Sequence, residues 1–146
     1  MIRKIQDADI CKVAEIWLDT NITTHNFIPA QYWQDNFELV KELFLQAEIY
    51  VYEDETSDKI WGFIGLENNY IAGIFVCSAM QSNGVGKQLL DFVKRIKAEL
   101  SLNVYGKNVR AVRFYQREGF RIQREDIDKN TNEKEYVMIW EKHYQK

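Results

Sequence analysis

The sequence predicts an α+β fold, in which helices lie on both sides of a mixed, mostly antiparallel sheet. Segments with the period of a strand alternate with segments with the period of a helix, in the order β-α-α-β-β-β-α-β-α-β-β. The series combines antiparallel hairpins with one central crossover. We therefore expect about six or seven strands and about four helices in a single domain, residues 1–146.

The first two predicted helices follow a short strand. Residues 2–5 suit that strand, and Asp7 or Asp9 can cap the helix after it. Residues 23–29 form a predicted loop between the two helices. The apolar residues at helical spacing are Ile10, Val13, Ala14, Trp17 and Leu18 in the first helix, and Trp33, Phe37, Val40 and Phe44 in the second.

Three predicted strands come next, at residues 49–53, 60–66 and 70–76. A polar turn separates the first two, and the pair Asn68-Asn69 suits a hairpin between the last two. A polar loop then leads to a helix. Its apolar residues at helical spacing are Val85, Leu89, Phe92, Val93, Ile96 and Leu100.

The rest of the chain predicts one more helix among three strands. The predicted segments are a strand at 102–105, a helix at 108–117, a strand at 120–123, a charged loop at 125–134 and a strand at 136–140. Gly119 is placed to end the helix.

The composition excludes several classes of protein. A net charge of −3 argues against a strongly basic nucleic-acid or membrane-surface protein. Neither a membrane-spanning run nor a signal peptide is recognisable. Two distant cysteines, Cys11 and Cys77, make no disulfide framework, and His25 and His143 lack the spacing of metal ligands. We therefore expect a cytoplasmic, metal-free protein that is a monomer or a weak homodimer.

A glycine-containing turn lies between the central strand and the helix that follows it. Gly84 and Gly86 allow a tight turn, so that backbone N–H groups at the helix start can face an anion. Residues 84–124 carry a local charge of +7, which also favours an anionic ligand. Two phosphate-binding motifs do not fit, because the dinucleotide motif needs glycine at Leu89 and the P-loop needs glycine at Gln81.

A second pattern lies on the next predicted helix. Asn108 and Tyr115 are seven residues apart, so they fall within roughly 20° of each other around the helix axis. Ala111 lies between them on the same side, and its small side chain lets a ligand approach the helix.

Together these patterns resemble the two motifs of the GCN5-related N-acetyltransferase (GNAT) superfamily, and the chain is similar to its small stand-alone bacterial members. The acyl-CoA motif Q/R-x-x-G-x-G/A is matched by Gln81, Gly84 and Gly86. The motif N-x-x-A-x-x-F-Y-x-x-x-G-F is matched by Asn108, Ala111, Phe114, Tyr115, Gly119 and Phe120. The resemblance implies the GNAT fold, with a splay between the fourth and fifth strands, and acetyl-CoA as co-substrate.

The resemblance also implies where the co-substrate binds. The implied residues of the loop and the helix start, whose amides face the pyrophosphate, are Gln81, Ser82, Asn83, Gly84, Val85, Gly86 and Lys87. The strand Gly73 to Val76, with Phe75 and Val76 as its implied contact residues, pairs its backbone with the pantetheine arm and holds the thioester. Asn108, Ala111 and Tyr115 contact the co-substrate from the next helix.

Acetyl transfer needs a proton donor for the departing thiolate and an amine that has lost its proton. The resemblance makes Tyr115 the general acid, and an unperturbed phenol, with a pKa of about 10, is protonated at neutral pH. Glu67, His25 or ordered water can take the proton of the amine. Phe27 and Tyr32 are expected to line the acceptor groove.

The expected function is acetyl transfer from acetyl-CoA to a primary amine, by direct attack in a ternary complex. No nucleophilic cysteine is supported, because no histidine or acid partner is fixed beside Cys77. A protein lysine is the favoured acceptor, while N-termini and small amines stay open. The alternative is an acyl-CoA sensor that binds the thioester without consuming it; nucleic acid and membrane partners are not expected.

Overall fold

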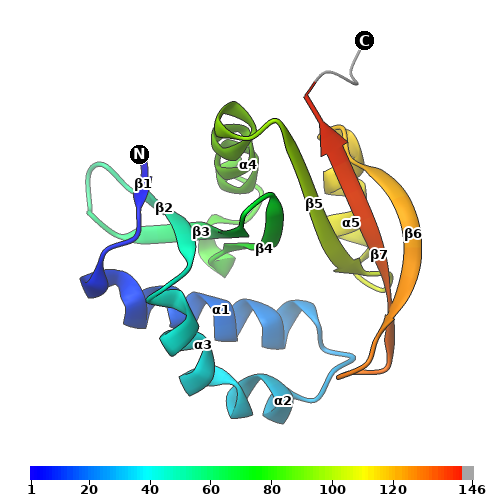
Figure 1. The fold of residues 1–146 in the computed structure, drawn as a ribbon. Coiled ribbons are helices and arrows are strands. Elements are labelled where there is room, and N and C mark those ends of the chain that lie inside the picture. The colour runs from blue at the N-terminus through cyan, green and yellow to red at the C-terminus, as the bar shows by residue number, and fades with distance from the viewer. Residues whose placement is uncertain (143–146) are drawn as a thin grey trace.

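The sheet and its helices have the expected α+β architecture. The structure, a computed structural model, describes residues 1–142, so His143 lies outside the described part. Seven strands form one sheet in the order β1-β2-β3-β4-β5-β7-β6, as Figure 1 shows. Every neighbouring pair is antiparallel except β4 and β5, which are parallel. The mixed, mostly antiparallel sheet that was predicted is confirmed.

The elements have the following bounds. The strands are β1 Ile2–Lys4, β2 Glu48–Glu53, β3 Ile60–Glu67, β4 Tyr70–Val76, β5 Glu99–Tyr105, β6 Arg121–Asp128 and β7 Glu133–Glu141. The α-helices are α1 Ile10–Thr24, α2 Ala30–Asp35, α3 Phe37–Phe44, α4 Val85–Ile96 and α5 Val109–Arg117. Two short 3-10 helices, η1 Asp7–Asp9 and η2 Ser78–Met80, precede α1 and follow β4.

The second predicted helix is in fact two helices, α2 and α3. The chain breaks at Asn36, whose side-chain amide donates a hydrogen bond to the Tyr32 carbonyl at 2.7 Å. In this way an asparagine side chain competes with the backbone hydrogen bonds of a helix. The spacing of apolar residues contains no information about such a side-chain bond, so it predicted one continuous helix. Described residues 1–142 therefore contain five α-helices, where about four were predicted.

Two predicted boundaries in the second half are wrong. The helix α4 ends at Ile96, and Leu100 lies in β5, where it is buried on the same face of the strand as Leu102. The charged segment predicted as a loop belongs mostly to β6 and the start of β7. It is a strand because β6 pairs with β7 along its length, which places many charged side chains on the exposed side of a hairpin.

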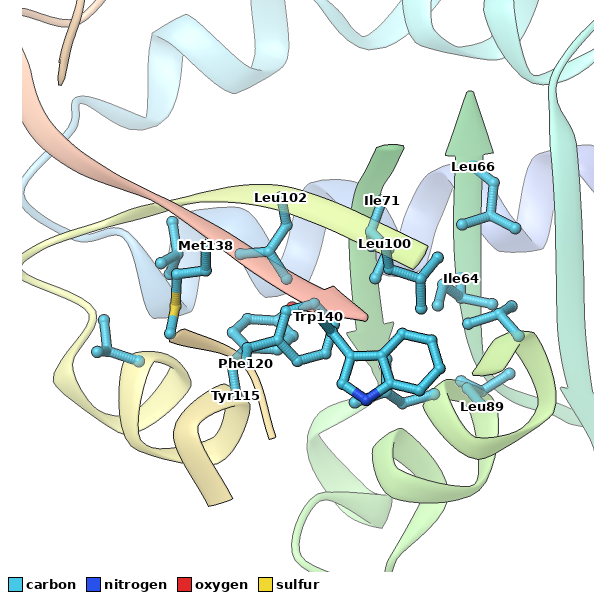
Figure 2. Packing of buried hydrophobic residues seen from close by; sticks show 14 of the residues in the cluster. Ile64, Leu66, Ile71, Leu89, Leu100, Leu102, Tyr115, Phe120, Met138 and Trp140 are labelled. Carbon is cyan, nitrogen blue, oxygen red and sulfur yellow. The ribbon is translucent and has the colours of Figure 1, made fainter. Parts of the chain in front are cut away.

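The sheet buries a separate apolar layer on each face. The helices α4 and α5 cover one face, where Leu89, Val93 and Val112 pack on strand residues such as Ile64 and Leu102. Figure 2 shows Tyr115 and Phe120 within this cluster, beside Met138 and Trp140. On the opposite face, Val13 and Ile16 of α1 pack on Ile49, Val51 and Phe63. This layering fixes α1 and α5 on opposite sides of the sheet.

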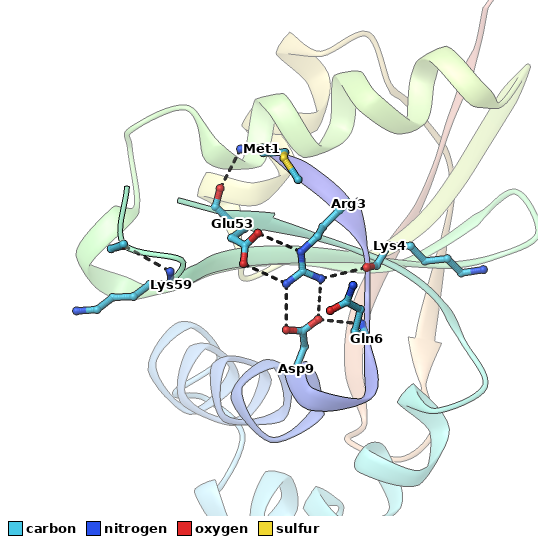
Figure 3. A network of polar contacts seen from close by, with 8 residues as sticks. Met1, Arg3, Lys4, Gln6, Asp9, Glu53 and Lys59 are labelled. Carbon is cyan, nitrogen blue, oxygen red and sulfur yellow. Dashed lines mark hydrogen bonds and ion pairs between the residues drawn. The ribbon is translucent and has the colours of Figure 1, made fainter. Parts of the chain in front are cut away.

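The first strand is held by an ion-pair network drawn in Figure 3. The Arg3 guanidinium donates to both carboxylate oxygens of Asp9, at 2.8 and 3.1 Å, and also to Glu53 of β2. Asp9 accepts a further bond from the Gln6 backbone N–H at 2.8 Å. The hydrogen bonds from Arg3 are the largest cause that lowers the pKa of the Asp9 carboxyl below its usual value, and the bond from the Gln6 backbone lowers it further. The network joins β1, η1 and β2 at one edge of the sheet.

The two parallel strands separate soon after they meet. Only Tyr70 and Ile71 of β4 pair with β5, opposite Ser101 and Leu102. Beyond Ile71, β4 has β3 as its only strand neighbour among residues 1–142. This is the predicted splay between the fourth and fifth strands, and it leaves one edge of β4 open.

No helix within residues 1–142 is long and apolar enough to cross a membrane. The same residues contain no group of three or more His, Cys, Asp or Glu side chains that could hold a metal ion.

Candidate active site

A cleft of about 550 Å³ opens where β4 and β5 separate. Most of its wall comes from three elements: Ile74 and Val76 of β4, the start of α4, and one side of α5. Thr24 of α1 and the loop before α4 complete the lining. The volume lies within the range of about 300–1,000 Å³ that is usual for small-molecule sites. A smaller hollow of about 100 Å³ adjoins it and shares Thr24, Gln81 and Asn108 with it.

The N-terminus of α4 provides one end of the cleft. Gly84 caps this helix with a φ of 81°, a left-handed conformation that glycine adopts without strain. The first-turn N–H groups of Val85, Gly86 and Lys87 have no carbonyl partners within a helix, and the helix dipole adds positive potential there. This end of the cleft is therefore built to bind an anion such as a pyrophosphate.

Charged side chains surround this helix start, but acidic groups already engage part of that charge. Lys87 Nζ lies 3.0 Å from Glu118 Oε1 and 3.5 Å from Asp91 Oδ2. The hydrogen bond to Glu118 is the main cause of the raised Lys87 pKa. Arg110 of α5 instead donates to the Ser82 hydroxyl at 2.6 Å, across the cleft from one motif to the other. Lys87 and Arg110 therefore bring positive charge to the anion end from two sides.

The open edge of β4 forms the middle of the cleft. Residues 73–76 of this strand are paired on one side only, with β3, so backbone groups on the other edge have no strand partner. One carbonyl of this segment, that of Val76, accepts a hydrogen bond from Gln81 Nε2 at 3.2 Å. A Cβ added to Gly86 would lie 3.8 Å from both Phe114 and Val76, which means that this glycine keeps the passage between β4 and α5 wide. An extended chain with amide groups, such as a pantetheine arm, fits this geometry.

Tyr115 lies at the inner end of the cleft, on α5. The residue is 8% exposed, and its ring packs edge-on against Phe120, with ring centroids 5.6 Å apart. Burial raises the phenol pKa well above its usual value, so Tyr115 is protonated at neutral pH. Among residues 1–142 the phenol has no hydrogen-bond partner, which leaves its proton available to a ligand in the cleft.

Comparison with known proteins identifies the family. The acetyltransferase (GNAT) domain family matches residues 46–122, just over half of the chain. The peptidyl-lysine N-acetyltransferase YiaC of Escherichia coli (strain K12) is 34% identical over 142 residues, which are 96% of each protein. The chain belongs to the GNAT family. It is therefore an acetyl-CoA-dependent N-acetyltransferase.

Other relatives agree with this assignment. The peptidyl-lysine N-acetyltransferase YjaB of Escherichia coli (strain K12) is 27% identical over 128 residues, 87% of this chain and 86% of that protein. The solution structure of apo-form YjaB from Escherichia coli superimposes with a TM-score of 0.85, at 25% identity over 96% of each chain. PaiA N-acetyltransferase from Thermoplasma acidophilum, solved in complex with coenzyme A, shares the fold with a TM-score of 0.80, at 18% identity over 97% of this chain and 98% of that one.

Most of the predicted co-substrate residues of this acetyltransferase meet at the cleft. Those that line it are Val76, Gln81, Ser82, Gly84, Val85, Gly86, Lys87, Asn108, Ala111 and Tyr115. Phe75 lines the smaller hollow, whereas Asn83 lines neither. Phe114 of the second motif also lines the apolar wall, together with Ile74 of β4. Met80 lines the same wall and was missed, because it carries no signal beyond its hydrophobicity.

The two predicted bases lie in different places. Glu67 is exposed at the end of β3, opposite Tyr70 in the hairpin, and lines neither hollow. His25 lines the smaller hollow and is half-buried. Desolvation lowers the His25 pKa from its usual 6.5 to about 4, so that the ring is neutral at physiological pH.

The predicted acceptor residues surround a polar patch on the face opposite α5. Phe27 packs edge-on against His25 and against Tyr105 of β5, with centroids 5.7 and 5.6 Å apart. The Tyr105 hydroxyl donates to Asp128 at 2.7 Å. The Tyr32 pKa is raised mainly by burial of its phenol, and the charge of Asp128 raises it further. Neither Phe27 nor Tyr32 lines either hollow. Phe27 contacts the smaller hollow through His25.

Three further residues of this patch were not predicted. The Tyr70 hydroxyl donates to Asn103 at 3.1 Å, and Asn103 donates to Glu135 at 2.9 Å. Burial raises the Glu135 pKa, and Asp128 adds to the effect. The signal was present in the sequence, because Asn103 and Tyr105 alternate along β5 with buried aliphatic residues and so share the other face.

Proposed function

We propose that this N-acetyltransferase binds acetyl-CoA along the open edge of β4 and transfers the acetyl group to the side-chain amine of a lysine. The observation that carries the proposal is the arrangement of Tyr115 beside that open edge, in one cleft with the amides at the start of α4. This arrangement supplies a site for the pyrophosphate, a surface for an extended amide chain and a proton donor.

The groups on the two sides of the cleft support direct transfer in a ternary complex. The neutral amine forms a bond to the thioester carbonyl carbon, and the negative oxygen that results can be stabilised by backbone N–H groups at the edge of β4. The C–S bond then breaks, and the Tyr115 phenol gives its proton to the departing thiolate. Solvent returns a proton to the phenol and takes the one that the amine releases.

The charge on the opposite face supports a cationic acceptor. Glu135 and Asp128 lie around Tyr105 and Asn103, so the patch carries acidic groups close to the end of α1. A lysine amine, with a usual pKa of about 10.4, needs roughly 4–5 kcal/mol to lose its proton at neutral pH, whereas an α-amine needs about 1 kcal/mol. Relatives at 34% and 27% identity are named peptidyl-lysine N-acetyltransferases, which supports the lysine among the possible amines.

The test is a thiol-release assay with the full chain, acetyl-CoA and three matched acceptors. The first is a peptide with one lysine and a blocked N-terminus, the second has arginine for lysine and a free N-terminus, and the third is a polyamine. We expect thiol release to be fastest with the lysine peptide, and mass spectrometry to place one acetyl group on its side chain. Faster acetylation of the free N-terminus or the polyamine would overturn the lysine assignment. Binding of acetyl-CoA without thiol release for any amine would support a sensor instead.

A further inference from the structure

A continuous chain of four hydrogen bonds links α1 to α5 beside the cleft. The Ala111 backbone N–H donates to Asn108 Oδ1 at 3.3 Å, and Asn108 Nδ2 lies 3.3 Å from His25 Nε2. On the other side of the ring, His25 Nδ1 lies 3.0 Å from Asn21 Oδ1. Asn21 Nδ2 in turn donates to the Trp17 carbonyl at 2.8 Å.

The two ends of this chain fix the direction of every bond in it. A backbone N–H can only donate, and a backbone carbonyl can only accept. Ala111 at one end therefore sets the Asn108 oxygen as acceptor and its NH₂ as donor, while Trp17 at the other end sets the orientation of Asn21. Between the two amides, His25 must accept at Nε2 and donate from Nδ1.

This direction leaves His25 without a free basic nitrogen. Nε2 holds its lone pair toward Asn108, and Nδ1 carries the proton that Asn21 accepts. The rings of Phe27, Trp33 and Tyr105 pack around the imidazole with centroids 5.0–5.7 Å away, which fixes its plane. His25 is therefore placed to hold another group rather than to take a proton from the acceptor.

The group that His25 holds is the Asn108 amide, which lines both the cleft and the smaller hollow. Asn108 is also the N-cap of α5, so the same amide sets where the helix that carries Tyr115 begins. With one N–H used by His25, the Asn108 NH₂ keeps a second N–H for a ligand in the cleft.

We propose that His25 and Asn21 are positioning residues for acetyl transfer, which fix the Asn108 amide at the boundary between the co-substrate cleft and the acceptor side. The expected effect of these two residues on kcat rests on the proposed function. Their expected effect on coenzyme A affinity does not depend on which amine is acetylated.

Three variants of His25 separate positioning from the other possible roles. His25→Gln places a side-chain amide where Nε2 lies and can still accept from Asn108. His25→Asn places an amide where Nδ1 lies and keeps only the bond to Asn21. His25→Phe keeps the aromatic packing and neither hydrogen bond. Coenzyme A affinity by titration calorimetry, steady-state kinetics and melting temperature are measured for each.

We expect His25→Gln to keep coenzyme A affinity within about two-fold of the original protein, and His25→Asn and His25→Phe to lose about ten-fold, as expected for one hydrogen bond. The kcat values should follow the same order, with no change in the acidic limb of the pH profile. Equal loss in His25→Gln and His25→Asn, together with loss of that acidic limb, would identify a general base and overturn the proposal. Full coenzyme A affinity in His25→Phe would show that aromatic packing at this position is sufficient without the hydrogen bonds, and this result would also overturn the proposal.

Discussion

The Arg110 guanidinium lies 2.6 Å from the Ser82 hydroxyl and so connects α5 to the loop that precedes α4. Ser82 has a φ of 68°, a left-handed conformation that is unfavourable for residues other than glycine. The bond to Arg110 helps to hold this conformation, in which the loop presents its backbone to the cleft. The two sequence motifs are thus physically joined.

Replacing Arg110 by glutamine should weaken coenzyme A binding. The Arg110→Gln variant loses both the bond to Ser82 and a positive charge beside the anion end, and we expect Kd to rise by roughly five- to ten-fold. Arg113→Gln is the matched control, because it removes the same charge from the same helix at an exposed position outside the cleft lining. Calorimetry at two salt concentrations checks the prediction, and equal weakening in the two variants would contradict it.

The sequence predicted the sheet, the crossover and the cleft because their signals are local. Glycines mark the tight turn before α4, and the seven-residue spacing of Asn108 and Tyr115 marks one side of α5. Most of the residues that carried the family motifs therefore line the cleft.

The parts that were mispredicted depend on specific contacts that the hydrophobic pattern does not record, some of them between distant residues. A charged stretch became β6 because β7 offered it a partner, and α2 separated from α3 because the Asn36 side chain bonds to the Tyr32 carbonyl. Likewise, the sequence alone gives no reason to pair His25 with Asn108, which lies 83 residues away. The pairing forms only in the folded protein, where the C-terminal end of α1 meets the N-terminal end of α5.

Two variants should distinguish the role of Gly86, which leaves space in the cleft, from that of Gly84, which has a left-handed backbone conformation. In Gly86→Ala the new methyl group meets nothing closer than 3.8 Å, so the protein should fold with unchanged or slightly higher stability, by up to about 1 kcal/mol. The methyl group nevertheless stands between Phe114 and Val76, and coenzyme A affinity should fall by about ten-fold. Calorimetry and thermal melts measure the two effects.

Gly84→Ala is the contrasting variant. Its Cβ has open space, with Gln88 Nε2 3.9 Å away, but the φ of 81° is strained for alanine. We expect a loss of roughly 1 kcal/mol in the free energy of unfolding. If Gly86→Ala were the less stable of the two, the room that the structure gives a methyl group at Gly86 would be wrong. Unchanged coenzyme A affinity in Gly86→Ala would contradict its role in the cleft wall.

Tyr115→Phe should separate binding from catalysis. The change removes only the phenol oxygen of a buried ring, so packing and coenzyme A affinity should stay within about two-fold, while kcat falls by about 100-fold or more. Because the phenol pKa is raised, the original protein should show no loss of the acid form across neutral pH. Tyr52→Phe on β2, away from the cleft, is the control. An unchanged kcat in Tyr115→Phe would exclude the phenol as proton donor.

The Arg3–Asp9 pair should make the protein sensitive to acid. The folded state lowers the Asp9 pKa below its usual 3.8, so this carboxylate adds stability above that pH and the stability is lost as the pH falls through the lower value. Asp9→Asn should reduce the free energy of unfolding at neutral pH by about 1–3 kcal/mol and flatten its decline below about pH 4. Urea unfolding as a function of pH checks both effects. Asp7→Asn, an exposed neighbour in the same short helix, should change little.

The acidic patch should control which acceptors are used. Glu135 lies on the face of the sheet opposite α5 and is held by Asn103, so Glu135→Gln keeps the hydrogen bond and removes the charge. We expect KM for a lysine peptide to rise by about three- to ten-fold while KM for acetyl-CoA stays constant, because only the cationic partner loses attraction. Glu125→Gln, on the neighbouring β6 and paired with Tyr136 on the other face, removes the same charge as a control. A selective effect of Glu135→Gln that weakens with added salt would link the patch to the acceptor, whereas equal effects of the two variants would reduce the patch to general surface charge.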